Sequence, residues 1–146
     1  MINKSLFIIG QSHSLLENKL KNKFSNIHNY KFFEIFLNDI SNQIIKNKPI
    51  CIFHPDLNFF KDFYNDKGEL EIILVTQRID KLLDFFDYVI FSPLLNYDYM
   101  NHHPIYSWSN LFLKINEIVK QFSDNQKFIY IKEKNEDILE RTKLRS

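Results

Sequence analysis

The chain has 146 residues, of which two are glycine and fifteen are phenylalanine, and it contains no alanine. This length suits one domain, and we expect residues 1–146 to form a single one. Apolar residues make up 45% and charged residues 25%, which excludes a disordered or collagen-like chain. The formal net charge is +1 and the lysines are scattered among acids and asparagines, so we expect no nucleic-acid partner.

Cys51 is the single cysteine, so the chain cannot form an internal disulfide or a cysteine-based zinc cluster. It lies within the apolar run of residues 49–53, which predicts a small buried hydrophobic side chain. The sequence shows neither a signal-peptide pattern nor an apolar stretch long enough for a bilayer. We therefore expect a cytoplasmic protein that is not associated with a membrane.

Apolar residues in the first part of the chain follow two spacings in turn. Residues 6–9 form a continuous apolar run that ends in Gly10, which is typical of a buried strand. Three apolar residues then recur at four-residue spacing: Leu16, Leu20 and Phe24. This spacing predicts an amphipathic helix that begins near Ser12 or Ser14.

The next two units repeat this order of strand and helix. Residues 32–36 predict a second strand, and the helix after it has Asn38 or Asp39 as its N-cap. Residues 49–53 predict a third strand, which ends before Pro55. The helix that follows shows one apolar face, formed by Leu57, Phe60 and Phe63.

The middle of the chain predicts two further strands. Residues 72–75 follow a turn at Gly68 and predict the fourth strand, and residues 88–91 predict the fifth. Between them lies a helix whose apolar face is formed by Ile79, Leu82, Leu83 and Phe86. A polar loop over residues 96–104 follows the fifth strand.

The most regular amphipathic helix comes after this loop. Its apolar face is formed by Leu111, Phe112, Ile115, Ile118, Val119 and Phe122. Residues 128–131 predict a sixth strand and residues 137–144 a terminal helix. Strands and helices that alternate in this way predict an α/β fold, a three-layer sandwich in which helices cover both faces of a mainly parallel sheet of five or six strands.

A ligand site in such a fold is expected outside the carboxyl ends of the strands, near the point where the strand order reverses. The segments expected at that edge are residues 10–14, 54–56, 76–78, 92–93 and 96–103. They contain four of the five histidines, all except His28. The clustering of these polar residues predicts a site at this edge.

Ser12 follows a buried strand and lies near a predicted helix N-terminus, where free backbone N–H groups can stabilise an anion. Ser12 or Ser14 would equally serve as the cap of that helix. His102 and His103 lie in a polar loop, which argues against a role in the core. Metal ligation by them would need His13, His54, Asp56 or Asp98 from other loops, and we predict no metal site.

Residues 6–14, which end in Gly10-Gln11-Ser12-His13-Ser14, resemble the opening block of the SGNH (GDSL-like) hydrolases. In that family a hydrophobic strand leads into Gly-Asp-Ser, whose serine is the nucleophile. The segment from Asp98 to Pro104 is similar to the family's Asp-x-x-His block, which precedes the last long helix. Here Gln11 stands in place of the family's aspartate, and the acid is four and five residues before the two histidines.

This resemblance implies acyl-ester hydrolysis or transfer. Ser12 would be the nucleophile, His102 or His103 the base and Asp98 the acid that orients it. The residues expected to bind the substrate or the oxyanion are Gly10, Gln11, His13, His54 and Asn96. Residues 89–93 also resemble an apolar strand ending in proline that is found in the WcbI-like proteins, a related group of polysaccharide biosynthesis.

A second resemblance is to two-component receiver domains, which share the flavodoxin-like arrangement of five strand–helix units. Thr76 matches the Ser or Thr that ends their fourth strand, and residues 87–93 resemble their fifth strand, which ends in Lys-Pro. Gly10 and Gln11 replace the acids that bind Mg²⁺, His54 lies at or near the position of the phosphoacceptor aspartate, and Ser92 replaces the lysine. The resemblance therefore implies a pseudo-receiver that acts as a protein-interaction module.

Two classes of function thus stay open. The first is an SGNH-like hydrolase or acyltransferase, which acts on a small molecule or a saccharide and needs no cofactor. The second is a non-catalytic, receiver-like module with a protein partner, for which a homodimer is one form. A Rossmann-type nucleotide site is not expected, because the chain contains no Gly-x-Gly-x-x-Gly and no Walker-type loop.

Overall fold

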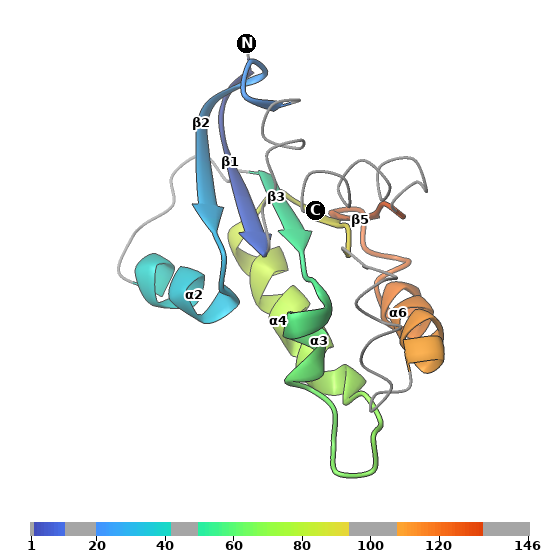
Figure 1. The fold of residues 1–146 in the computed structure, drawn as a ribbon. Coiled ribbons are helices and arrows are strands. Elements are labelled where there is room, and N and C mark those ends of the chain that lie inside the picture. Colours follow the sequence, from blue (N-terminus) through green and yellow to red (C-terminus); the bar gives the residue numbers. More distant parts are fainter. Residues whose placement is uncertain (1, 11–19, 42–49, 94–107, 133–146) are drawn as a thin grey trace, which may run out of the picture.

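The structure is a computed structural model, and it describes residues 2–10, 20–41, 50–93 and 108–132. Five strands and four α-helices lie in these ranges (Figure 1). In chain order they are β1 (Ile2–Gly10), β2 (Phe24–Tyr30), α2 (Phe33–Ser41), β3 (Ile50–His54), α3 (Leu57–Lys61), α4 (Ile72–Phe85), β4 (Tyr88–Phe91), α6 (Trp108–Gln121) and β5 (Phe128–Tyr130).

The five strands form one sheet in the order β2-β1-β3-β4-β5, and every neighbouring pair is parallel. The predicted α/β fold with a parallel sheet is thereby confirmed. The chain first steps from β1 outward to β2, and then returns across β1 to β3 and continues in that direction. This is the flavodoxin-like order, in which the strand order reverses between β1 and β3.

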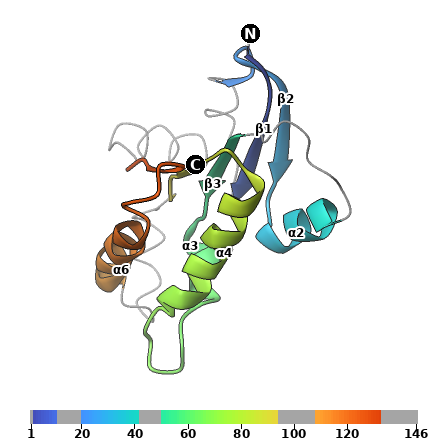
Figure 2. The same ribbon diagram turned by 180° about the vertical axis from the view of Figure 1, so that it is seen from behind.

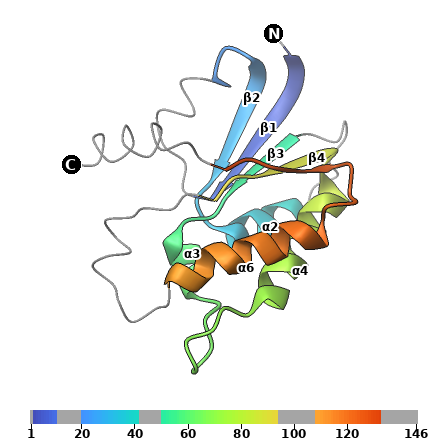
Figure 3. The ribbon, with the colours of Figure 1, turned by 90° about the vertical axis from the view of Figure 1, so that its right-hand side faces the viewer.

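Helices α2, α3, α4 and α6 lie on one side of the sheet (Figures 2 and 3). Alternate strand residues point toward them, among them Ile9 and Phe53, which are buried. The residues in between point to the other face, where Leu6 and Ile8 are fully buried and Leu20 packs against them. Because both faces of the central strands are buried, the sheet is the middle layer of a three-layer fold.

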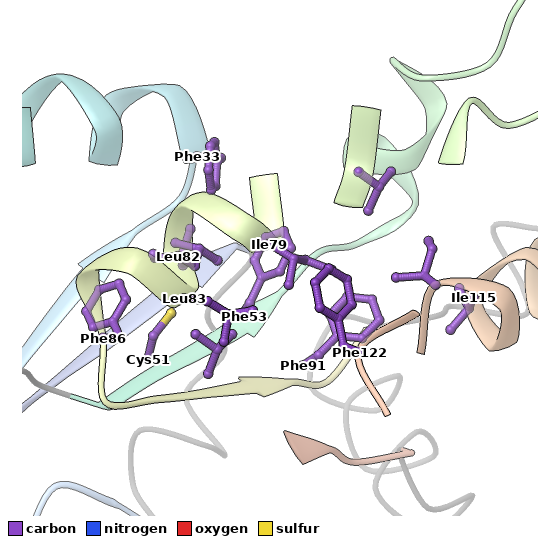
Figure 4. Packing of buried hydrophobic residues seen from close by; sticks show 14 of the residues in the cluster. Phe33, Cys51, Phe53, Ile79, Leu82, Leu83, Phe86, Phe91, Ile115 and Phe122 are labelled. Carbon is purple, nitrogen blue, oxygen red and sulfur yellow. The ribbon is translucent and has the colours of Figure 1, made fainter. Parts of the chain in front are cut away.

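The core on the helix-covered side combines aliphatic side chains with many phenylalanines (Figure 4). Phe53 and Phe91 contact each other from adjacent strands with ring centroids 5.8 Å apart, and Phe36 stacks on Phe86 at 5.6 Å. Such rings each bury a large apolar area, so a few of them fill the space between helix and sheet. Cys51 is buried among them, as predicted, and burial raises the pKa of its thiol well above its ordinary value.

The prediction of a second strand over residues 32–36 is wrong, because this segment begins α2 and the second strand is residues 24–30. Phe33, Phe36 and Ile40 are buried on one face of α2, at a helical spacing of three and four residues. A short apolar run does not by itself distinguish a strand from a buried helix. Phe24, assigned by its spacing to the first helix, begins β2 instead.

The prediction of a fourth strand over residues 72–75 is also wrong, since α4 already begins at Ile72. Its buried face includes Val75 and Ile79, so the helical period of residues 79–86 extends back through the apolar run. Thr76 therefore lies in α4, with its hydroxyl donating to the carbonyl of Ile73, and not at the edge of the sheet. This removes one of the matches to receiver domains.

The remaining predicted elements correspond to β3, α3, β4, α6 and β5. The loop over residues 96–104 and the helix over residues 137–144 lie outside the described residues. In the part of the chain that the structure describes, no helix combines the length and the apolar character needed to cross a membrane.

Candidate functional site

A cavity of about 290 Å³ opens at the carboxyl ends of β1 and β3, beside the first turn of α2, Phe59 of α3 and the residues that flank α3. It is lined by Ile9, Gly10, Lys31, Phe32, Phe33, Glu34, Phe53, Pro55, Asp56, Phe59, Asp62 and Phe63. In Figure 1 the arrowheads of β1, β2 and β3 point toward this region. The cavity thus lies at the point where the strand order reverses, which is the place at which ligands bind in open parallel sheets.

Gly10 ends β1 at the cavity and lies directly beside His54, its register partner on β3. Its φ is +121°, in a region that residues with a side chain rarely adopt. A Cβ at this position would come within 2.0 Å of the carbonyl oxygen of His54. Only glycine lets the two strand ends approach this closely, so Gly10 sets the shape of this end of the cavity.

His54 ends β3 and its side chain is buried at 5% exposure. Its ring Nδ1–H donates to the carbonyl of Ser92, just beyond β4. The backbone N–H of Ser92 in turn donates to the carbonyl of Phe53 at 2.9 Å. These contacts join the carboxyl ends of β3 and β4, and His54 is not among the described residues that line the cavity.

Asp56 determines where α3 begins. Its backbone is extended, and its carboxylate Oδ1 accepts a hydrogen bond from the Phe59 N–H at 3.0 Å. Pro55 precedes it and cannot donate to a strand ladder, so β3 ends and α3 starts within three residues. This tight connection brings Phe59 back over the strand end and into the cavity wall.

Four phenylalanine rings form a continuous aromatic wall around the cavity. The ring of Phe53 contacts that of Phe33 at 6.0 Å and that of Phe59 at 5.4 Å, between centroids. Phe59 in turn contacts Phe63 at 4.8 Å. The wall therefore joins α2, β3 and α3, and its geometry is fixed by edge-to-face and tilted ring contacts.

Charged side chains lie around this wall. Three carboxylates line the cavity, those of Glu34, Asp56 and Asp62, against one ammonium group, that of Lys31. Arg78 of α4 binds Glu34 with an Nη2 to Oε1 distance of 3.0 Å. Three acidic residues and one basic residue thus line the cavity, and Arg78 is a second basic residue beside it.

Arg78 also supports the wall itself. Its guanidinium carbon lies 4.4 Å from the ring centroid of Phe63 and 5.8 Å from that of Phe33. Its Nη1 donates to the carbonyl of Leu74 in the same helix. The arginine thus links α4 to the rings and to the acid on α2, which positions that side of the cavity.

The structure brings only part of the predicted site together. Gly10 lines the cavity, while His54 is adjacent to Gly10 but turned toward Ser92. The other predicted site residues lie outside the described residues: Gln11, Ser12, His13, Asn96, Asp98, His102 and His103. Within the described ranges, no three His, Cys, Asp or Glu side chains are placed to hold a metal ion.

Sequence reasoning missed the side of the cavity that α2 and the residues just before it provide, including Glu34 and Lys31. The signal was the helical spacing of Phe33, Phe36 and Ile40, which places Glu34 in the first turn of a helix. On the other side of the cavity, Asp56 lies in a segment that the sequence places at this edge, whereas Asp62 was not expected there. Comparisons of the chain with protein-family models, with curated proteins and with solved structures find no match.

Proposed function

We propose that the protein binds a small molecule in the cavity at the carboxyl ends of β1 and β3, and that it hydrolyses or transfers an acyl ester there. One observation carries the proposal: Gly10, the residue that opens the predicted Gly-Gln-Ser-His-Ser block, lines this cavity. Ser12 follows Gly10 by two residues in the sequence, and two residues of chain span at most about 7 Å. This short separation in the chain supports Ser12 as the nucleophile of a site at this cavity.

The proposed chemistry is acyl transfer through a covalent intermediate. His102 or His103 takes the proton of the Ser12 hydroxyl while its oxygen attacks the acyl carbonyl, and Asp98 orients the histidine. Backbone N–H groups and the Asn96 amide stabilise the oxyanion. The alcohol leaves with the proton from the histidine, and water or a second alcohol then releases the acyl group.

Turnover of p-nitrophenyl acetate by the wild type and by Ser12→Ala tests this proposal. We expect the substitution to lower kcat/KM about 100-fold or more, because the acyl-enzyme can no longer form. Ser14→Ala is the matched control, since it removes a hydroxyl from the same segment and leaves the proposed nucleophile in place. Turnover that Ser12→Ala leaves unchanged would rule out Ser12 as the nucleophile.

A second candidate function is a receiver-like interaction module, which the strand order β2-β1-β3-β4-β5 favours. Since β3 ends in His54 and β1 in Gly10, such a module would lack the acids of the ordinary phosphorylation site. It would then act through its helix faces. This candidate predicts no p-nitrophenyl acetate turnover above the solvent rate and no mass increase after incubation with acetyl phosphate.

A further inference from the structure

We infer that the cavity at the ends of β1 and β3 binds an uncharged apolar group of about six carbons, carried on the acyl or the alcohol side of the ester. This inference rests on the proposed function, because it treats the cavity as the place where one part of that ester binds. It adds the chemical class of the substrate, an ester with an apolar group.

The lining of the cavity changes from apolar to charged with increasing exposure. Four lining residues are buried, and all four are apolar: Ile9, Phe33, Phe53 and Pro55. Three charged lining residues are exposed: Lys31, Glu34 and Asp62. A group that enters toward the buried side chains therefore meets apolar surface, while these charged groups stay in contact with water.

Charged groups beside the cavity already have partners within the protein. Glu34 binds Arg78, and the Asp56 carboxylate accepts a hydrogen bond from the Phe59 N–H. Lys31 and Arg78 also lie over aromatic rings of the lining. A charged ligand would have to compete with these contacts and lose its own hydration, whereas an uncharged apolar group pays neither cost.

A saccharide fits this lining less well than an apolar chain or ring does. Sugar hydroxyls need a hydrogen-bond partner wherever they leave water. Among the buried lining residues that the structure describes, no side chain is polar. The same surface stabilises an apolar group, since each methylene that leaves water strengthens binding about fourfold.

The volume of the cavity sets the size of the group. An apolar cavity of roughly 150 Å³ is large enough to bind benzene. At about 290 Å³, the cavity here has room for a six-carbon chain or an aromatic ring. An acetyl group would leave most of this space unused.

Three esters test the inference on the full chain, with acid release followed in a pH-stat. Ethyl acetate has no long chain, ethyl hexanoate carries six carbons on the acyl side, and hexyl acetate carries them on the alcohol side. We expect kcat/KM for at least one of the six-carbon esters to exceed that for ethyl acetate about tenfold or more. The preferred ester shows which side of the bond lies in the cavity. Equal values for all three would overturn the inference and leave the proposed ester hydrolysis standing.

Phe59→Ala tests whether this preference comes from the cavity, since Phe59 is a half-buried residue of its wall. We expect the ratio of kcat/KM between the preferred six-carbon ester and ethyl acetate to fall about threefold or more. Phe85→Ala is the matched control, because Phe85 is a half-buried phenylalanine of α4 that is not among the described lining residues. The same fall in both variants would contradict binding in this cavity.

Two ketones separate binding from hydrolysis, because they carry acyl groups that cannot be released. 2-Heptanone carries the hexanoyl group and acetone the acetyl group, and isothermal titration calorimetry on the full chain measures both dissociation constants. We expect 2-heptanone to bind about tenfold or more tightly than acetone. Such a difference without hydrolysis of any ester would keep the apolar cavity and contradict the proposed function. Equal binding of the two ketones would overturn the inference.

Discussion

The two glycines of the chain occupy regions that differ in what surrounds them. Both have a positive φ, +121° at Gly10 and +77° at Gly68. A Cβ on Gly10 would lie 2.0 Å from a backbone oxygen of β3, whereas no described atom lies within 4 Å of the corresponding position on Gly68. The first glycine is required by the approach of two strands, the second by a local turn.

The turn around Gly68 is held by its own short-range hydrogen bonds. The Asn65 side-chain oxygen accepts from the N–H groups of Lys67 and Glu69 at 2.9 and 3.0 Å, and Gly68 N–H donates to the Asn65 carbonyl. The loop extends away from the sheet (Figure 1). Such a turn can change without affecting the core, whereas a change at Gly10 affects two strands and the cavity between them.

The largest effect is expected for Gly10→Ala, which should lower the free energy of unfolding by about 4 kcal/mol or more. The added methyl group must displace the His54 carbonyl while the backbone keeps an unfavourable φ. Urea denaturation, monitored by far-UV circular dichroism, measures this loss in the free energy of unfolding. A loss of less than about 1 kcal/mol would mean that β1 and β3 are not this close.

Phe53→Ala is expected to cost about 3 kcal/mol, at the low end for a buried phenylalanine because the residue already borders a cavity. Phe53 is 1% exposed and contacts the rings of Phe33, Phe59 and Phe91. Phe32→Ala is the matched control at the same cavity, since Phe32 is 56% exposed and should cost less than about 1 kcal/mol. Similar losses for the two, again measured in urea, would contradict the packing described.

Asp56→Ala should cost about 1 kcal/mol, through loss of the N-cap of α3. Asp56→Asn keeps an oxygen that can accept from the Phe59 N–H, so most of this stability should return. Thermal unfolding of the three proteins measures the difference. Equal losses for the alanine and asparagine variants would show that the charge, and not the cap, is what matters here.

Stability should also fall as the pH rises above about 9. Burial raises the pKa values of the Cys51 thiol and of the Tyr64 and Tyr130 hydroxyls. The unfolded chain therefore loses these protons first, so stability is level below the unfolded pKa of cysteine, about 8.5, and declines above it. For Cys51 alone the decline is about 1 kcal/mol per pH unit, and Cys51→Val should remove that part.

The smallest effect is expected for Gly68→Ala, about 1 kcal/mol, because the new side chain has space and only its positive φ is unfavourable. Reaction of Cys51 with a thiol reagent sharpens the contrast between the two glycines. Cys51 should stay protected in Gly68→Ala and become accessible at low urea in Gly10→Ala. Equal protection of the Cys51 thiol in the two variants would contradict the difference described between the surroundings of the two glycines.

Much of the fold could be predicted from the sequence, for physical reasons that differ between elements. β3 is buried on both faces, and β4 is buried on one face with Ile90 half-buried on the other, so both appear as continuous apolar runs. α6 has a long apolar stripe. β2 is an edge strand in which Asn26, His28 and Asn29 are exposed, so it has no such run. Because no strand was predicted over residues 24–30, the second strand was assigned to residues 32–36, most of which belong to α2.

The site could be predicted only where its elements could. Parallel strands place their carboxyl ends at one edge of the sheet. Because the ends of β1 and β3 were predicted correctly, Gly10 and Asp56 were expected at the edge where the cavity lies. Lys31 and Glu34 depend on α2, which was not predicted. The contacts of Arg78 with Glu34 and Phe63 could not be predicted, because they join three elements whose relative placement depends on the whole core.

The central claim is that a small molecule binds at the ends of β1 and β3. The most direct test is a ¹H–¹⁵N NMR titration of the full chain with 4-nitroacetanilide, the amide analogue of p-nitrophenyl acetate. We predict chemical-shift changes concentrated at the backbone amides of Gly10, Glu34 and Phe59, with none at Gly68. Changes confined to other residues, or none at saturating probe, would contradict the account.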